Sequence, residues 1–176
     1  MLRIGLDIDD VLGDFMGWYK LRFECDKYPN RLKEHIITRN VQNVLRKEKS
    51  FWVGMPVINK PDFEPVLYCT KRVNPKSWTK KWLDDNNFPK APIYQVMSQG
   101  KNKADVIKGR VDVFIDDSVK NFIALNLAGV PCLLMDTPGN EWWGPIGRVY
   151  SLNEAEIQEV YDLFMTTVFP NFRNLL

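Results

Sequence analysis

The sequence has 176 residues, of which 45% are hydrophobic and 26% charged, and its formal net charge at pH 7 is +2. This length suits one main globular domain with a small insertion, and the near-neutral charge does not by itself require nucleic acid or an anionic membrane as a partner. No segment reaches the roughly 18 consecutive apolar residues of a membrane span, and the N-terminus does not resemble a signal peptide, so we expect no membrane partner and no secretion. The three cysteines form no CxxC pair and indicate reduced thiols and a cytoplasmic location: Cys25, Cys69 and Cys132.

The chain begins with a short apolar run that leads directly into acidic residues. Residues 2–6 have the length of a buried strand, and Asp7 and Asp9 follow it, with Asp10 next to them. In parallel α/β sheets ligands bind in the crevice beyond the carboxyl ends of the strands. We therefore expect Asp7 and Asp9 to lie at a catalytic edge, whereas Asp10 has no assigned role.

The next part of the chain is predicted to be helical. Residues 11–25 place apolar side chains three and four apart, which favours a helix, and residues 31–50 are polar, basic and weakly periodic, which suggests small helices. We find no strand pattern between residues 15 and 55. The predicted organisation is a core domain of residues 1–14 and 56–176, with residues 15–55 inserted as a small helical cap.

The remainder alternates strands with helices. Strands are predicted at 65–70, 93–97, 111–115 and 132–135, and helices at 75–86, with Asn74 as N-cap, at 102–108, at 119–128 before a terminating Gly129, and from a capping box at 151–154 to about residue 168. This alternation is typical of a parallel sheet with right-handed crossovers, so the predicted class is α/β.

The polar residues at the strand ends form a set suited to phosphoryl transfer. Two carboxylates on different strands, such as Asp7 and Asp116, can hold Mg²⁺, and a carboxylate can also attack phosphorus. A lysine and a hydroxyl, here Lys103 and Thr70, can orient phosphate oxygens, and a second acid such as Asp9 can transfer the proton of the leaving group.

In these residues the chain resembles the haloacid dehalogenase superfamily of phosphatases. Its first motif, a strand followed by Asp-x-Asp, corresponds to residues 6–12, and its second, a strand ending in Thr, corresponds to residues 67–70. Its third, a lysine at a helix start, fits Lys103 within residues 100–105, with Lys101 as the rival. Its fourth, a strand ending in Asp-Asp, corresponds to residues 113–117.

The resemblance implies a Rossmann-like, haloacid dehalogenase-type sheet and a mechanism through an aspartyl-phosphate. It implies that Asp7 is the nucleophile, Asp9 the general acid/base, and Thr70 and Lys103 the phosphate ligands. The implied Mg²⁺ site consists of Asp7, the backbone carbonyl of Asp9, and Asp116, with Asp117 as a secondary contact.

The opening of the chain is most similar to that of the 5′(3′)-deoxyribonucleotidases, although Asp10 stands where glycine is usual in that family. This resemblance implies a small-molecule phosphate monoester as substrate, with a (deoxy)nucleoside monophosphate as the leading candidate. For the substrate pocket we select the aromatic pair Phe15 and Trp52, and the basic residues Lys71 and Arg72. The alternatives are that the two rings belong to the core of the cap and that the two cations lie on a solvated surface.

The sequence also allows two other functions. The same chemistry could act on a polynucleotide 3′-phosphate or on another small metabolite. A non-enzymatic phospho-receiver also combines acids, a Thr and a Lys on an α/β sheet, but it places its phosphorylated Asp after the acid pair, whereas this chain ends its series with Asp116 and Asp117. The sequence does not distinguish a monomer from a homodimer.

Overall fold

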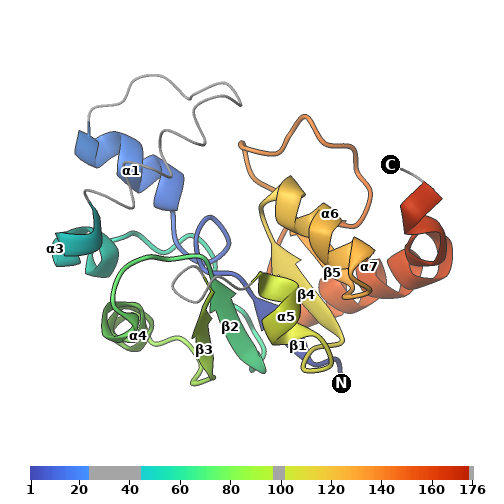
Figure 1. Ribbon diagram of the computed structural model, residues 1–176, viewed down its shortest axis with the longest axis horizontal. Coiled ribbons are helices and arrows are strands. Elements are labelled where there is room, and N and C mark those ends of the chain that lie inside the picture. Colours follow the sequence, from blue (N-terminus) through green and yellow to red (C-terminus); the bar gives the residue numbers. More distant parts are fainter. Residues whose placement is uncertain (24–44, 97–101, 175–176) are drawn as a thin grey trace.

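The computed structural model of the chain describes residues 1–23, 45–96 and 102–174, which form an α/β fold around a six-stranded sheet (Figure 1). The strands are β1 (Ile4–Leu6), β2 (Leu67–Thr70), β3 (Ile93–Gln95), β4 (Val113–Asp116), β5 (Cys132–Met135) and β6 (Arg148–Val149). Their spatial order is β3-β2-β1-β4-β5-β6, and every neighbouring pair is parallel. This Rossmann-like order confirms the predicted fold class.

The central strands are short and buried on both faces, and they are apolar except for Thr70 at the end of β2 and Asp116 at the end of β4. Every residue of β1, β2, β4 and β5 is buried, as expected for a parallel sheet covered by helices on its faces. Strands β2 and β3 lie on one side of β1, whereas β4, β5 and β6 lie on its other side. The order of the strands therefore reverses between β1 and β4, which are neighbours in the sheet. In open parallel sheets such a switch point is where the strand ends leave a crevice for ligands.

The helices that follow the strands are α4 (Lys76–Asp85), α5 (Lys103–Ile107), α6 (Val119–Leu127), α7 (Glu154–Thr167) and the 3₁₀ segment η4 (Phe169–Asn174). Helices α5 and α6 lie in front of the strands in Figure 1. Gly129 has φ +77° just after α6, as predicted for its terminating residue. Among the described residues, no helix combines the length and the apolar character needed to cross a membrane.

Between β1 and β2 the chain forms α1 (Phe15–Phe23), the 3₁₀ turn η2 (Leu45–Lys47) and α3 (Lys49–Val53). These elements have a small hydrophobic cluster of their own, which consists of Tyr19, Leu45, Phe51 and Trp52. Figure 1 shows α1 and α3 beside the sheet, with α3 above α4. Most of the helical region predicted at 31–50, and Cys25, lie outside the described residues.

The inserted elements are joined to the core through a narrow neck. The N–H of Asp14 donates to the carbonyl of Pro56 (2.9 Å), and Gly13 forms an antiparallel bridge with Val57. Gly13 also packs tightly against the core, because a Cβ at this position would lie 2.2 Å from Cε of Met55 and 2.9 Å from the ring of Trp82. The chain therefore leaves and re-enters the core at adjacent points.

The first helix begins later than the sequence predicted. Residues 9–13 form a tight turn in which the carbonyl of Ile8 accepts the N–H groups of Leu12 and Gly13. Asp10 has φ +57°, a left-handed conformation that cannot continue a right-handed helix. The helix therefore starts only at Phe15 and not at residue 11.

The helix caps also differ from the prediction in two places. Asn153, not Ser151, caps α7 by accepting the N–H of Glu156 (3.1 Å), while Ser151 donates its hydroxyl to the Glu156 carboxylate. At α4 the cap position belongs to Pro75; the Asn74 Oδ1 has no donor among the described residues, and the Asn74 amide nitrogen donates to the Thr79 hydroxyl. Strand β6 was not predicted, because its two residues are too few to show the alternation of apolar and polar side chains that indicates a strand.

Candidate active site

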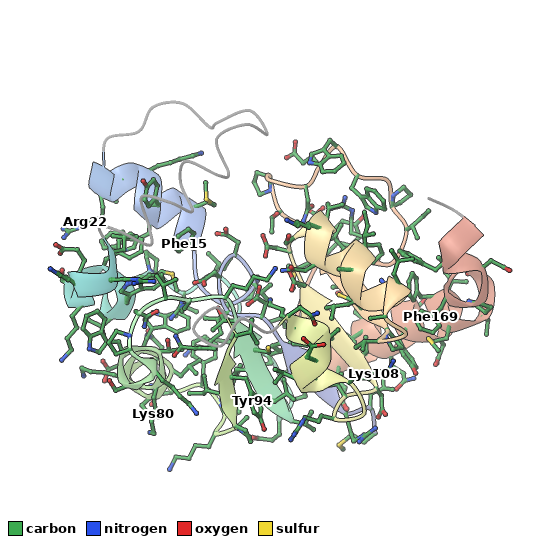
Figure 2. The ribbon with its side chains drawn as sticks, viewed as in Figure 1. Phe15, Arg22, Lys80, Tyr94, Lys108 and Phe169 are labelled. Carbon is green, nitrogen blue, oxygen red and sulfur yellow. The ribbon has the colours of Figure 1, made fainter. Side chains whose placement is uncertain are left out.

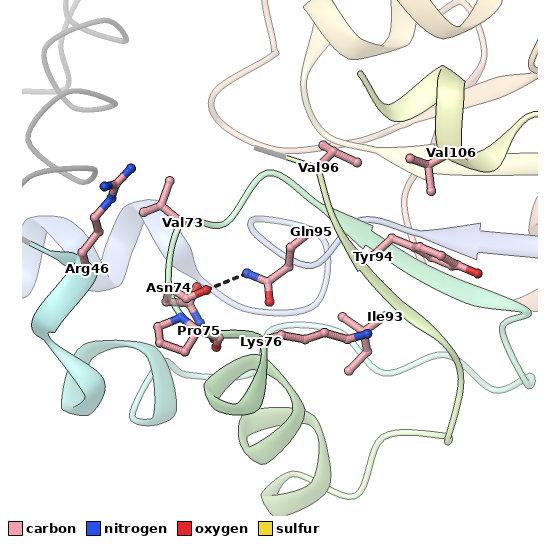
Figure 3. Close-up of a pocket in the computed structure, with 10 residues that line it drawn as sticks. All are labelled: Arg46, Val73, Asn74, Pro75, Lys76, Ile93, Tyr94, Gln95, Val96 and Val106. Carbon is pink, nitrogen blue, oxygen red and sulfur yellow. Dashed lines mark hydrogen bonds between the residues drawn. The ribbon is translucent and has the colours of Figure 1, made fainter. Parts of the chain in front are cut away.

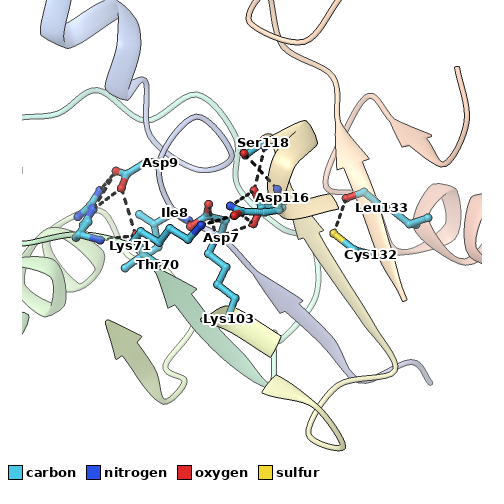
Figure 4. Close-up of polar contacts among 12 residues, drawn as sticks. Asp7, Ile8, Asp9, Thr70, Lys71, Lys103, Asp116, Ser118, Cys132 and Leu133 are labelled. Atoms are coloured by element: carbon cyan, nitrogen blue, oxygen red, sulfur yellow. Dashed lines mark hydrogen bonds and ion pairs between the residues drawn. The ribbon is translucent and has the colours of Figure 1, made fainter. Parts of the chain in front are cut away.

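Three of the predicted site residues meet at the switch point of the sheet. The ammonium group of Lys103, the first residue of α5, lies 2.6 Å from Oδ2 of Asp7 after β1 and 2.6 Å from Oδ2 of Asp116 at the end of β4 (Figure 4). All three side chains are almost completely buried. Two carboxylates thus share one buried cation. The motifs predicted these three residues at the strand ends, with the acids on Mg²⁺ and Lys103 on the phosphate, and both of those roles stay predictions. The rival Lys101 lies outside the described residues.

Burial changes the protonation of this group. Burial raises the pKa of Asp7 to about 7, against the opposing effect of Lys103, and the nearby Asp116 and Asp9 raise it further. Burial alone would lower the pKa of Lys103, but Asp116 and Asp7 together raise it above its ordinary range. The lysine therefore stays charged between the two acids.

Asp116 is held in place by donors that begin the following helix. Its Oδ1 accepts the N–H of Ser118 (3.0 Å), and the amide of Asn121 donates to both of its oxygens (3.0 and 3.1 Å). The carbonyl oxygen of Asn121 in turn accepts from Lys71. The sequence did not predict Asn121 as a site residue. Its position as a polar residue on the buried face of α6 could have indicated such a role.

A third carboxylate adjoins the pair. Asp7, Asp116 and Asp117 each offer an oxygen, and these oxygens lie within 4.8 Å of one another. Burial raises the pKa of Asp117 well above its ordinary value, and the neighbouring Asp10 and Asp116 add to the effect. Such a concentration of carboxylate oxygens is suited to a hard divalent cation.

The other predicted acid, Asp9, lies beside Thr70 and Arg72. The Thr70 hydroxyl donates to its Oδ2 (3.2 Å), and Arg72 donates to its Oδ1 from Nη2 (2.7 Å) and Nε (2.9 Å). Of the two cations predicted for the pocket, Lys71 is exposed and reaches Asn121, whereas the side chain of Arg72 has no exposed surface. Arg72 therefore faces Asp9 and not open solvent.

The two predicted aromatic residues pack within the inserted elements. Phe15 is half-buried at the end of α1 nearest to the sheet (Figure 2), and its ring stacks on that of Trp52 with 5.9 Å between centroids. Trp52 is fully buried, and its Nε1 donates to the carbonyl of Leu45 (2.9 Å). A substrate could therefore contact Phe15 directly, but it could reach the Trp52 ring only after a rearrangement.

Asp10 occupies a special backbone position. Its φ of +57° explains why glycine would suit this position, and its Oδ1 accepts the N–H of Met16 in α1 (2.9 Å). Burial raises its pKa to about 7, opposed by the hydrogen bond from Met16 and assisted by the neighbouring acids Asp9 and Asp14. Asp10 thus links the turn after β1 to the first helix of the insertion.

The loop after β5 is attached to the same site. The Asn140 amide donates to the carbonyl of Asp117 (2.8 Å) and to that of Met135 (2.7 Å). The buried Arg148 donates to Oδ1 of Asn140 and to the carbonyl of Trp143 (2.7 Å). This network, which the sequence did not reveal, fixes the loop next to Asp117.

A pocket of about 880 Å³ opens beside the segment that follows Thr70 (Figure 3). Its walls combine aliphatic groups, two amides, one aromatic ring and two cations, and no acid is among the described lining residues: Arg46, Val73, Asn74, Pro75, Lys76, Ile93, Tyr94, Gln95, Val96 and Val106. The amide of Gln95 donates to the Asn74 carbonyl (2.9 Å). Its size is within the range of small-molecule sites, and its charge suits an anion.

No protein-family model matches the chain, and a search of the curated proteins finds no match. Its function is therefore inferred from the residues of the site.

Proposed function

We propose that the protein is a Mg²⁺-dependent phosphomonoesterase that uses Asp7 as its nucleophile. The observation that carries the proposal is the contact of Lys103 with both Asp7 and Asp116, at 2.6 Å each, at the switch point of a parallel sheet. Asp9 and Thr70 contact each other at the same edge. The order of these residues along the chain is that of the haloacid dehalogenase phosphatases, which the motifs resemble.

The residues present fit a magnesium ion. Asp7, Asp116 and Asp117 supply oxygen ligands only, and the ammonium of Lys103 already occupies a cationic position between two of them. When bound, Mg²⁺ would neutralise charge on the phosphate and on the carboxylates around it. The predicted participation of the Asp9 carbonyl stays a prediction.

The side chains would divide the reaction as follows. A carboxylate oxygen of Asp7 attacks phosphorus, and the bond from phosphorus to the leaving oxygen breaks. Lys103 neutralises and orients the phosphate oxygens, and the Thr70 hydroxyl would join it by turning its single proton from Asp9 to the phosphate. Asp9 gives a proton to the leaving alcohol and later takes one from the water that releases phosphate from Asp7.

The preferred substrate is a nucleoside monophosphate. The resemblance to the deoxyribonucleotidases suggests it. The pocket of about 880 Å³ begins three residues after Thr70 and carries Arg46 and Lys76, so it has room and charge for an anion, but Asp7, Asp9, Thr70 and Lys103 do not line it. The buried free thiols of Cys69 and Cys132 support a reducing compartment such as the cytoplasm.

The test is hydrolysis of a panel of phosphate esters by the wild type and by Asp7→Asn, with Mg²⁺ and with EDTA. The panel compares thymidine, deoxyuridine and ribonucleoside monophosphates with sugar phosphates and with a 3′-phosphorylated oligonucleotide. We expect Mg²⁺-dependent turnover, with nucleoside monophosphates as the best substrates, and its loss in Asp7→Asn. The exposed acid Asp84 gives the control, because Asp84→Asn should retain full activity. Turnover that survives in Asp7→Asn contradicts the proposal, and the best-hydrolysed ester identifies the substrate class.

A further inference from the structure

We propose that Arg72 is a positioning residue that holds Asp9 for proton transfer to the leaving group and does not itself contact the phosphate. This inference rests on the function proposed above and adds a residue whose role the motifs do not assign. It depends on three features of Arg72: its contacts with Asp9, its enclosure by two tryptophans, and its lack of exposed surface.

The first feature is the number of hydrogen bonds that fix the Asp9 carboxylate. Arg72 donates to Oδ1 from Nη2 (2.7 Å) and from Nε (2.9 Å), and a longer bond joins Nε to Oδ2 (3.2 Å). The Thr70 hydroxyl donates to Oδ2 at 3.2 Å. A carboxylate held on both oxygens cannot rotate freely about its Cβ–Cγ bond, so its orientation is set by Arg72 and Thr70 together.

The second feature is the enclosure of the guanidinium group. Its central carbon lies 5.1 Å from the centre of the Trp52 ring in α3 and 5.3 Å from that of the Trp82 ring in α4. Both distances are within the range of a cation–π interaction, which is strongest away from water. The side chain is therefore held between an aromatic residue of the insertion and one of the core.

The third feature is that the guanidinium cannot reach the substrate. The Arg72 side chain is 0% exposed, whereas that of Asp9 is 24% exposed. The remaining nitrogen, Nη1, has no hydrogen-bond partner among the described residues, although it is buried. The Arg72 backbone is also fixed, since its N–H donates to the Thr70 hydroxyl (3.3 Å) and its carbonyl accepts from Gln95 (3.3 Å). Arg72 therefore acts on the reaction through Asp9.

The chemistry makes this role measurable. In the first step a bond forms between Asp7 and phosphorus, and the bond from phosphorus to the ester oxygen breaks. Asp9 enters this step protonated on Oδ2 while its Oδ1 keeps the two short hydrogen bonds from Arg72, and the Oδ2 proton moves to the ester oxygen, giving the free alcohol. A nucleoside is a poor leaving group that needs this proton. The p-nitrophenolate ion leaves without one, so its departure does not depend on the position of Asp9.

The experiment compares kcat/KM of wild type and Arg72→Met on thymidine 5′-monophosphate and on p-nitrophenyl phosphate. This parameter covers only the steps up to cleavage of the ester bond, so hydrolysis of the aspartyl-phosphate does not affect it. We expect a loss of about 10²-fold on the nucleotide and less than about 5-fold on the aryl ester, as for loss of a general acid. Arg72→Lys should also lose much more activity on the nucleotide than on the aryl ester, because an ammonium group lacks the planar fork that spans a carboxylate. This variant replaces Arg72→Met in the experiment if Arg72→Met does not fold.

A double-mutant cycle locates the effect. Asp9→Asn should likewise lose much more kcat/KM on the nucleotide than on the aryl ester. The double variant Asp9→Asn with Arg72→Met should lose little more kcat/KM on the nucleotide than Asp9→Asn alone. Arg3→Met is the matched control, because it removes an arginine from an ion pair with Asp112 that lies at the exposed amino end of β1 and β4, and both activities should stay unchanged.

The outcomes separate the two proposals. Equal losses on both esters, or fully additive losses in the cycle, would overturn the role of Arg72 and indicate a structural part or direct phosphate binding. Wild-type protein that hydrolyses neither ester with Mg²⁺ would instead overturn the proposed function, and the assignment of Arg72 with it.

Discussion

Lys103 and Asp116 form an ion pair of 2.6 Å in which both side chains are almost wholly buried. The same ammonium lies 2.6 Å from Asp7, so a single positive charge compensates two buried negative ones. Removing one member of a buried ion pair leaves a charge with neither water nor a partner. The stability of the fold and the proposed chemistry therefore depend on the same three residues.

The first prediction concerns Lys103→Met. We expect this variant to lose the proposed activity and about 3 to 5 kcal/mol of unfolding free energy, since it leaves Asp7 and Asp116 without their cation. Urea denaturation at pH 8 in EDTA measures the loss. The control is Lys80→Met, which breaks an exposed pair with Asp84 and should cost less than about 1 kcal/mol. Equal costs for the two variants would show that the buried pair is not important for stability.

The second prediction concerns metal binding. A ligand that binds only the folded protein raises its unfolding temperature, so millimolar Mg²⁺ should raise the melting temperature of the wild type. Asp116→Asn removes one carboxylate of the proposed site and should lose most of this increase, as followed by calorimetry with Mg²⁺ and with EDTA. Asp112→Asn, at the other end of β4 and paired with Arg3, should keep it. A full Mg²⁺ shift in Asp116→Asn would place the ion elsewhere.

The third prediction concerns pH and Asp10. Because its folded pKa is raised to about 7, the folded protein binds this proton more tightly than the unfolded chain. Asp10 thus lowers the unfolding free energy as pH rises from about 4 to about 7. Asp10→Asn cannot ionise, tolerates a left-handed backbone and keeps an acceptor for Met16. One pKa unit corresponds to about 1.4 kcal/mol, so this variant should gain up to roughly 4 kcal/mol over wild type at pH 8 and only about 1 kcal/mol at pH 4.5.

Urea titrations in EDTA at the two pH values measure this effect. Asp112→Asn gives a control of opposite sign, because the hydrogen bond from Arg3 lowers the pKa of Asp112. That substitution should therefore cost more at pH 8 than at pH 4.5. A gain for Asp10→Asn that does not change with pH would show that ionisation of Asp10 is not its cause.

The fourth prediction concerns Gly13→Ala. The added Cβ would meet both the end of the flexible Met55 side chain and the rigid ring of Trp82, so something in the core must shift. Overpacking of this kind typically costs 1 to 3 kcal/mol, which thermal or urea unfolding would detect. Gly144→Ala is the matched control, since nothing lies within 4 Å of its Cβ position. An unchanged free energy of unfolding in Gly13→Ala would show that Met55 and Trp82 can move to accommodate the added methyl group.

The sheet and the meeting of Asp7, Lys103 and Asp116 could be predicted because they follow from periodicity and chain order. Parallel strands bring their carboxyl ends to one edge, so an acid after β1 and another at the end of β4 lie on the same edge. They meet because β1 and β4 are neighbours in the sheet, an order that the alternation of elements does not determine. The start of α5 at Lys103 follows from the same alternation, with Asn102 as its cap. The pattern of elements predicted that the acids share this edge, whereas the place of Lys103 beside them depended on the order of the motifs.

The direction of individual side chains could not be predicted. Lys71 and Arg72 are adjacent cations, yet one is exposed and the other is buried between two tryptophans from different elements. Which of them faces Asp9 depends on packing between α3 and α4, which no local pattern encodes. The same holds for Asn121 and Asn140, whose partners are determined by the positions of whole elements.

The neck formed by Asp14 and Pro56 makes the architecture modular. With the two ends of the insertion hydrogen-bonded to each other, the cost of closing the segment between them grows only with the logarithm of its length, about 0.6 kcal/mol per doubling. Segments of very different length can therefore be exchanged at this point while β1, β2 and β4 keep their register. Trp52 sets a constraint on such an exchange: a grafted segment must bring its own flat ring for Arg72, or the acid that Arg72 orients will lose its support.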